Sequence, residues 1–288
     1  MLPASRVEEL KEEFNVSTDD LLRALITPAS ALARPPISSF HVGAAGIGGS
    51  GALYVGCNLE FAKLPLYNSV HAEQFLLVNA LHHGETALKK LAISAAPCGH
   101  CRQFFSELAC ADSIKFLFFG GSYSLGQLLP MRFKPTDLLD SKEAPLLLQP
   151  QHHKVAFSQE SKQQIRAWED AGETQLVEAA YEALKECEKS YSPYSKCPAG
   201  AAILTTDGGV YAGGYIESAA YNPSMLPLQS AIIDAVIDGM PCYSEMKGAI
   251  LVEVDGGPVQ HRKTMEVNVS QIAPQAKFYC LHVEKTAE

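Results

Sequence analysis

The chain has 288 residues, 47% of them hydrophobic, so it can bury one large core or two of ordinary domain size, and this composition argues against a disordered chain. A formal net charge of −9 argues against a protein that holds nucleic acid by its phosphates, because such proteins gather Lys and Arg. We therefore expect a small or neutral partner, no nucleic acid and no membrane.

The pattern of cysteines and the amino-terminal sequence indicate the cellular compartment in which the protein is expected. The 8 cysteines are scattered apart from one C-x-x-C pair, unlike the disulfide framework of small secreted proteins. The amino terminus has no basic segment leading into an apolar one, and no apolar run approaches membrane-spanning length. A cytoplasmic protein of the cytosol with reduced thiols is the expectation.

Hydrophobic periodicity predicts an α/β protein. Residues 1–33 are typical of a helical extension. The first half is then expected to contain hairpin strands at 42–47 and 52–55 around a turn at 48–51, a helix at 70–83 ended by Gly84, a strand at 91–95, a helix at 98–109 and a strand at 114–119. Elements in this order build a layered α/β domain.

The sequence contains a degenerate internal repeat with an offset of 157 residues. Residues 36–45 align with 193–202, and residues 54–60 align with 211–217 without a gap. The duplication predicts an N-terminal helical extension at 1–33, a first domain at 34–148, a linker at 149–165 and a degenerate second domain at 166–288.

Two short runs carry the chemistry: residues 71–73 (HAE) and residues 97–101 (PCGHC). Cys98 and Cys101, at i and i+3, lie on one side of a helix start, where the helix dipole favours thiolates. His71 supplies a third ligand and leaves the fourth tetrahedral position open for water, which is typical of catalytic zinc. We expect one Zn²⁺ per chain.

Glu73 is the candidate catalytic residue. Residues at i and i+2 do not normally share a helix face, so His71 and Glu73 converge only in a first turn, with the site off the end of the helix. A carboxylate there can take a proton from activated water and hand it to a bound substrate. The N–H group of Ala72, unpaired in a first turn, is then free to bind a substrate carbonyl.

The repeat does not preserve these residues. At the 157-residue offset His71 falls on Leu228, or on Pro227 with one gap, and Glu73 falls on Ser230 or Gln229. Residues 97–101 fall on 254–258, which contain no thiol. The second half is expected to have kept the fold and lost the metal.

Two other uses of Cys98 and Cys101 remain open: a thiol–disulfide module and a structural zinc module. The run CGHC also occurs in protein disulfide isomerases, although here Ala96 and Pro97 precede it where a Trp-containing context is expected. A structural zinc site normally has a fourth ligand at close spacing, and His100, inside the turn, is poorly placed and is interpreted as a spacer.

The chain resembles the two-domain, homodimeric members of the cytidine and deoxycytidylate deaminase family, whose zinc signature is H-x-E…P-C-x-x-C. The resemblance covers nearly the whole length. It rests on residues 40–43 (FHVG), 57–61 (CNLEF), 70–74 (VHAEQ), 97–104 (PCGHCRQF) and 217–223 (ESAAYNP).

This resemblance implies two tandem α/β/α domains, each a mixed sheet with helices on both faces. It also implies pyrimidine salvage: zinc-dependent hydrolysis of cytidine and 2′-deoxycytidine to uridine and 2′-deoxyuridine with release of ammonia. A deaminase of cytosine in polynucleotides is the rival enzyme. The net negative charge disfavours that rival, as does a carboxylate at the sugar site, which repels phosphate.

The family likeness also assigns residues. It implies that His71, Cys98 and Cys101 bind zinc and that Glu73 shuttles protons. The substrate-binding set expected with Ala72 comprises Phe40 on the pyrimidine, Asn58 and Glu60 at the ribose hydroxyls, and Leu59. A segment of the other subunit is expected to close over the site: Ala219, Ala220, Tyr221, Asn222 and Pro223. Ser218 departs from the commoner Asn of the family.

Overall fold

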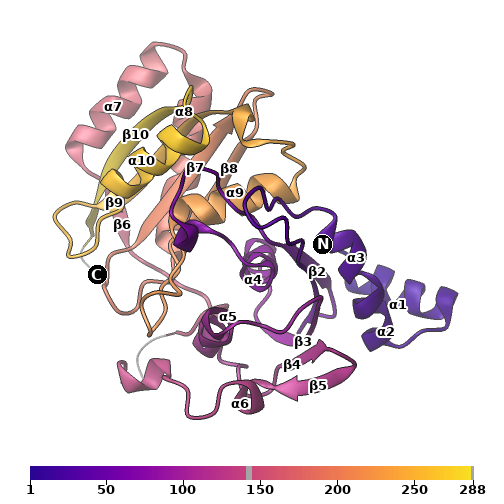
Figure 1. Ribbon diagram of the computed structural model, residues 1–288. Coiled ribbons are helices and arrows are strands. Elements are labelled where there is room, and N and C mark those ends of the chain that lie inside the picture. Colours follow the sequence, from indigo (N-terminus) through magenta and orange to yellow (C-terminus); the bar gives the residue numbers. More distant parts are fainter. Residues whose placement is uncertain (141–144, 287–288) are drawn as a thin grey trace. The chain divides into compact units, whose positions relative to one another are not determined.

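The computed structural model describes residues 1–140 and 145–286, which divide into two compact units (Figure 1). Unit 1 comprises residues 1–149 together with 218–223, and unit 2 comprises 150–217 together with 224–288. A short segment of the degenerate half is therefore part of unit 1.

Unit 1 contains a five-stranded mixed sheet in the order β2-β1-β3-β4-β5, in which only β3 and β4 run parallel. Its elements are α1 (Ala4–Phe14), α2 (Thr18–Ala24), α3 (Ile26–Ser30), β1 (Gly43–Gly48), β2 (Leu53–Cys57), η1 (Leu66–Asn68), α4 (Ala72–His82), β3 (Leu88–Ile93), α5 (Gly99–Phe104), η2 (Phe105–Glu107), β4 (Lys115–Phe118), β5 (Gly121–Ser124), α6 (Leu125–Leu128) and η3 (Pro135–Asp137).

Unit 2 also contains a five-stranded mixed sheet, in the order β6-β10-β9-β7-β8, with β9 and β10 parallel. Its elements are β6 (Val155–Phe157), α7 (Gln159–Asp170), α8 (Thr174–Lys189), β7 (Ala199–Thr205), β8 (Val210–Gly214), α9 (Pro227–Ile237), η4 (Tyr243–Glu245), β9 (Met246–Val254), α10 (Arg262–Ile272) and β10 (Lys277–Lys285). The expected fold, two tandem α/β domains with mixed sheets, is confirmed.

Glycines of the repeat let helices approach both faces of each sheet. A Cβ on Gly43 would lie 2.3 Å from the Ile26 carbonyl oxygen of α3, and one on Gly56 would lie 2.2 Å from that of Ala72 in α4. Their repeat partners do the same: a Cβ on Gly200 would lie 2.2 Å from the Ala183 oxygen of α8, and Gly213 faces α9 equally closely. Real Cβ atoms cannot approach so closely, so these positions require glycine.

The predicted helical extension is an integral layer of unit 1. Val7 and Leu22 are completely buried and pack with Ala45 of β1 and Ala92 of β3. The helices α1 to α3 thus cover the sheet face opposite α4.

The expected linker at 149–165 belongs to unit 2 from Pro150 onward. Residues 155–157 form β6, which pairs with β10, and α7 begins at Gln159. Val155 and Phe157 are buried in the unit 2 core, which explains why an apparently irregular stretch is ordered.

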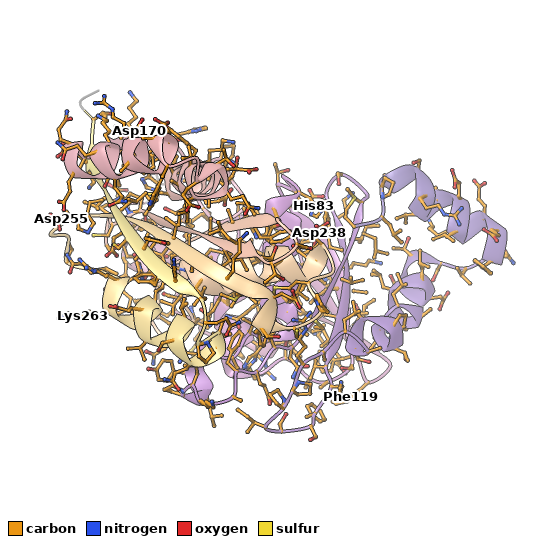
Figure 2. The ribbon with its side chains drawn as sticks, turned by 90° about the horizontal axis from the view of Figure 1, so that it is seen from above. His83, Phe119, Asp170, Asp238, Asp255 and Lys263 are labelled. Carbon is orange, nitrogen blue, oxygen red and sulfur yellow. The ribbon has the colours of Figure 1, made fainter. Side chains whose placement is uncertain are left out.

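Element boundaries differ from the expectation by a few residues. The first long helix begins at Ala72 rather than at residue 70, and its capping residue His83 is marked in Figure 2. The helix after Cys98 ends at Phe104 and continues as the 3-10 turn η2, and β5 was not anticipated. None of the described helices combines the length and apolar character needed to cross a bilayer.

Candidate active site

The first turn of α4 presents His71 and Glu73 together. His71 is the N-cap residue, with extended backbone angles of φ −85° and ψ 154°, and its N–H donates to the Gln74 side chain at 3.2 Å. Because Ala72 and Glu73 are the first two helical residues, their N–H groups have no partner within the helix. The side chains of His71 and Glu73 therefore lie at the N-terminal end of α4, as predicted from their i, i+2 spacing.

The first turn of α5 presents the two thiols. Cys98 is its N-cap residue, and the Arg102 N–H donates to the Cys98 carbonyl oxygen at 3.0 Å. Cys101 lies one turn further and is completely buried, whereas Cys98 is exposed. Cys98 thus lies just before the first residue of α5, and Cys101 lies in its first turn.

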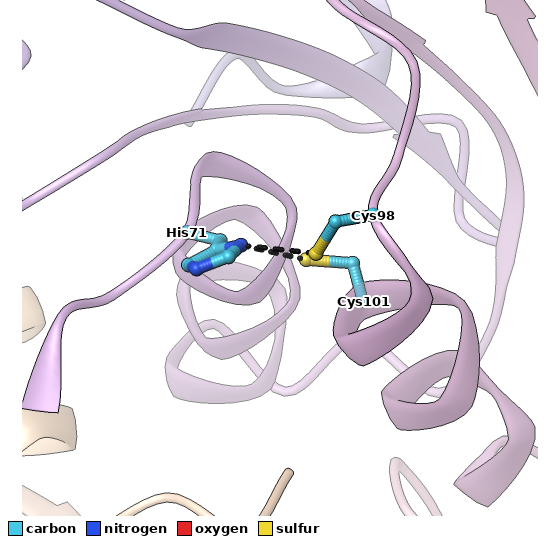
Figure 3. Close-up of side chains that lie close together, drawn as sticks. All are labelled: His71, Cys98 and Cys101. Atoms are coloured by element: carbon cyan, nitrogen blue, oxygen red, sulfur yellow. Dashed lines mark hydrogen bonds between the residues drawn. The ribbon is translucent and has the colours of Figure 1, made fainter. Parts of the chain in front are cut away.

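The three expected ligands converge (Figure 3). Nδ1 of His71 lies 3.4 Å from the Sγ atom of Cys98 and 3.4 Å from that of Cys101. Ligand atoms of a tetrahedral zinc ion, with Zn–N of about 2.05 Å and Zn–S of about 2.3 Å, are about 3.5 Å apart. One imidazole and two thiols at this spacing fit a zinc ion.

The pKa values of the two thiols are shifted in opposite directions. A hydrogen bond from the Cys101 thiol lowers the pKa of the Cys98 thiol to about 3; burial opposes this effect and His71 adds to it. Burial raises the pKa of the Cys101 thiol. Cys98 is thus a ready thiolate, the form that binds metal.

Glu73 lies beside these ligands in a dry environment. Its side chain is only 4% exposed, and burial raises the pKa of its carboxyl above the ordinary value, against smaller lowering effects that include His71. A raised carboxyl pKa suits a group that accepts a proton and later returns it near neutral pH.

A pocket of about 440 Å³ opens onto the metal ligands within unit 1. Its wall brings together most of the predicted site residues, namely Phe40, Asn58, Glu60, His71, Ala72, Glu73 and Cys98. Several wall residues were not predicted to bind substrate: Ile37, Ser38, Val42, Leu66, Ser69, Val70, Ile93, Ala95 and Ala96. Val42 and Val70 lie inside the quoted motifs and the others lie near them in the chain, and that adjacency was the available signal.

Leu59 is the exception among the predicted pocket residues. Its side chain is completely buried, and its main chain exchanges hydrogen bonds with Val70 at 2.9 and 2.8 Å. In the strand-like run 58–60 successive side chains point to opposite sides, so Asn58 and Glu60 face the pocket while Leu59 enters the core.

Asn58 and Glu60 both hold the loop that carries Phe40. The Asn58 side chain accepts from the Val42 N–H and donates to the Phe40 carbonyl oxygen, each at 2.9 Å. The Glu60 carboxylate accepts from the N–H groups of Ile37 and Ser38, each at 2.9 Å, and from the Ser38 hydroxyl. Burial alone would raise the pKa of Glu60, but these hydrogen bonds bring it below its ordinary value.

The second half of the chain repeats this arrangement, in which a carboxylate accepts from two N–H groups of a loop. Glu217 accepts from the N–H groups of Tyr194 and Ser195 at 2.7 and 3.1 Å. Holding this loop is therefore the common role of Glu60 and Glu217. Asn58, in contrast, is replaced by Tyr215 at the repeat offset.

The structure corrects the alignment of the repeat at the metal ligands. The α9 helix begins after Leu226, whose N–H donates to Gln229 as His71 donates to Gln74. Leu226 is thus the counterpart of His71, rather than Leu228 or Pro227, because the preceding loop is two residues shorter. On the same alignment Leu228 replaces Glu73, so the conclusion that the copy lacks both residues holds.

His100 is more than a spacer. Its ring stacks on His71 with centroids 5.3 Å apart, and its Nε2 lies 3.0 Å from Nε2 of Gln74. Gln74 in turn accepts from the His71 N–H. Both side chains support the orientation of His71, as second partners of metal-ligating histidines commonly do.

The 218–223 segment is anchored at both ends to residues of unit 1. At one end the Glu107 carboxylate, completely buried in η2, accepts from the Ser218 hydroxyl at 3.1 Å and from the Ala219 N–H at 2.7 Å. At the other end the Pro223 carbonyl oxygen accepts from Gln74 at 3.5 Å. Between them Ala220, Tyr221 and Asn222 are exposed. Nothing in the sequence linked Glu107 to Ser218.

Comparison with known proteins gives the same assignment over both halves. Profiles described as "Cytidine and deoxycytidylate deaminase zinc-binding region" match residues 17–117 and 125–266. Cytidine deaminase 1 of Arabidopsis thaliana is 38% identical over 98% of this chain and 97% of its own length.

Bacterial proteins match as well. A cytidine deaminase of Yersinia pseudotuberculosis serotype IB is 40% identical over 88% of this chain and 80% of its own length. A crystal structure of cytidine deaminase from Mycobacterium tuberculosis matches 41% of this chain and 98% of its own, at 30% identity and a TM-score of 0.38.

Proposed function

Because the chain belongs to the cytidine and deoxycytidylate deaminase family, we propose that its pocket deaminates cytidine at a zinc centre formed by His71, Cys98 and Cys101. The chain is a cytidine deaminase, a hydrolase, and converts cytidine and 2′-deoxycytidine to the uridine nucleosides with release of ammonia. The observation that carries this proposal is the convergence of the three ligand atoms beside a buried carboxylate at the pocket wall.

When bound, zinc would bring the pKa of water from about 15.7 towards about 7, so that hydroxide is available at neutral pH. Glu73 then takes a proton from the attacking water, gives it to the ring nitrogen of the pyrimidine, and later delivers one to the departing amine. The unpaired N–H of Ala72 donates to the pyrimidine carbonyl oxygen. The exposed Phe40 ring packs on the base.

The sugar site favours a nucleoside. Asn58 and Glu60 retain acceptor capacity beyond the bonds that hold the Phe40 loop, and both face the pocket where a ribose would lie. The charged Glu60 carboxylate would repel a nearby phosphate. Incubating the chain with cytidine or with a cytosine oligonucleotide, and following ultraviolet absorbance, tests this; preference for the oligonucleotide would contradict it.

We expect Glu60→Gln to lower kcat/KM for cytidine by about 10- to 100-fold, mostly through KM, because a charge-assisted hydrogen bond is worth about 1.5–3 kcal/mol. Steady-state kinetics measure the effect. Ser38→Ala is the matched control, since it removes the hydroxyl bond to Glu60 but keeps the carboxylate. If both variants lose kcat/KM equally, loop order rather than sugar binding is responsible.

We also propose that the chain is a homodimer in which residues 220–222 reach the pocket of the partner. Tyr221 is 68% exposed and has a left-handed φ of 59°, which is unfavourable for a residue with a side chain. Ala219 and Pro223 are buried on their own chain and anchor the segment. Residues 220–222 between them are exposed and can contact the partner. Exposed Leu66 at the pocket and Tyr67 next to it offer an apolar rim.

A mixing experiment tests closure by the partner. Glu73→Gln and Tyr221→Ala chains are each expected to be poorly active as homodimers. Co-expressed in equal amounts they should regain about a quarter of wild-type activity, because half the dimers hold one intact site built from two chains. Pairing Glu73→Gln with His71→Ala is the control and should restore nothing. A monomer in solution, or no recovery, would refute the proposal.

The cytosol is the compartment we propose. All 8 cysteines are free thiols, which fits a reducing environment.

A further inference from the structure

Unit 2 contains a second group of metal-ligating side chains. One ligand atom each from Glu253, Cys280 and His282 lies within 4.8 Å of the others. These residues are not remnants of the first site, because the N-cap residues that correspond to His71 and Cys98 are Leu226 and His261. They match no motif in the sequence.

Sheet register brings the three donors to one face. The strands β9 and β10 run parallel, with Glu253 opposite His282. Cys280 lies two residues before His282, so its side chain points to the same side of the sheet. The backbone of His282 is fixed by the Ser161 hydroxyl, which accepts from its N–H at 2.7 Å and donates to its carbonyl oxygen at 2.9 Å.

The Glu253 carboxylate divides its two oxygens between two partners. Oε2 accepts from the His261 N–H at the start of α10, at 2.6 Å, which fixes the carboxylate in place. Oε1 faces the Cys280 Sγ atom at 3.9 Å. Tetrahedral zinc with Zn–S of about 2.3 Å and Zn–O of about 2.1 Å places these atoms about 3.6 Å apart, so a shift of a few tenths of an ångström suffices.

The cluster has a route to solvent, and a further carboxylate lies beside it. Glu253 is 3% exposed, but the His282 side chain is 25% exposed. Asp255, labelled in Figure 2, lies in the turn after β9, and its Oδ1 is 3.8 Å from Nδ1 of His282. A cation entering past His282 would meet this carboxylate.

The carboxylates of Glu253 and Asp255 near the Cys280 thiol outnumber the guanidinium of Arg262 there and favour a cation. A divalent metal ion that binds there displaces the thiol proton to solvent. A site with one sulfur, one nitrogen and oxygen ligands selects Zn²⁺ over Mg²⁺ or Ca²⁺, which prefer oxygen alone.

We propose that Glu253, Cys280 and His282 bind a second Zn²⁺ ion. Glu253 lies on β9 and accepts from the His261 N–H at the start of α10, and the other two ligands lie on β10, so this zinc is structural: it joins β9 to β10 next to the start of α10. The proposal is independent of the catalytic assignment in unit 1.

Metal stoichiometry of the full chain tests the proposal. The metal-free chain is titrated with Zn²⁺ alone, desalted and analysed by atomic emission. Wild type is expected to retain two equivalents, and Cys280→Ser and His282→Ala one each, with cytidine turnover within about twofold of wild type because the first site is intact. Cys242→Ser, which removes an exposed thiol outside the cluster, is the matched control and should retain two.

Cobalt substitution identifies which site is lost. Each thiolate bound to Co²⁺ contributes ligand-to-metal charge-transfer absorbance, so Cys280→Ser should lose about one third of the band from three thiolates. His71→Ala should keep the unit 2 equivalent while losing turnover, which separates failure of this proposal from failure of the catalytic one. A single equivalent in wild type, or two in Cys280→Ser, would overturn the second site.

Discussion

Replacing Glu73 by Gln should lower kcat for cytidine by at least about 10³-fold, because proton transfer by a positioned side chain contributes about 10²–10⁴ and Glu73 serves more than one transfer. The amide keeps the size of the buried side chain but cannot accept a proton. Since Glu73 is not a ligand, zinc content should equal that of wild type. Ultraviolet turnover assays, atomic emission and circular dichroism measure these three quantities.

The matched control for this variant is Glu169→Gln, an exposed residue of α7, which should turn over cytidine at the wild-type rate. A Glu73→Gln chain that remained active would refute the mechanism. A chain that lost both zinc and activity would show that Glu73 holds the metal site together rather than moving protons.

Removing zinc with a chelator should abolish turnover without unfolding unit 1. The side chains that build its core, among them Phe104, Phe105 and Phe116, pack independently of the metal. Far-ultraviolet circular dichroism should therefore be retained, and adding Zn²⁺ should restore the activity.

This experiment also decides between the other uses of Cys98 and Cys101. A purely structural zinc predicts that chelation unfolds unit 1. A thiol–disulfide module predicts no stoichiometric zinc and a reducible bond between the two cysteines. His71→Ala, which removes one ligand but neither thiol, is the control: it should stay inactive after zinc is returned.

The sequence by itself was sufficient for the metal centre. The two runs match the zinc signature of the family, and within each run the spacing acts in a single helix start. His71 meets Cys98 and Cys101 only where α4 and α5 pack together. The ungapped parts of the repeat were also sufficient for the tandem fold. Gly43 and Gly56, with their copies, are required wherever a helix packs this closely on a strand.

Local pattern could not reveal contacts that depend on how distant segments pack. Val155 and Phe157 form a strand only because β10 offers an edge for them, so the local sequence predicts a linker at 149–165 instead. The sequence offset places the copy of His71 one or two residues too far along the chain, because the length of a loop between repeated elements leaves no periodic signal.

The hydrogen bonds from the Phe40 loop to Glu60, and the contact between Glu107 and Ser218, are likewise visible only in the tertiary structure. Glu107 and Ser218 are 111 residues apart, and a buried carboxylate finds its hydrogen-bond donors only once the chain has folded around it. The sequence by itself predicted the chemistry of this protein because the residue types and spacing within each of its two runs are a recognisable zinc signature. The tertiary structure decided which segments support that chemistry, because burial and hydrogen-bond pairing are properties of the whole folded chain.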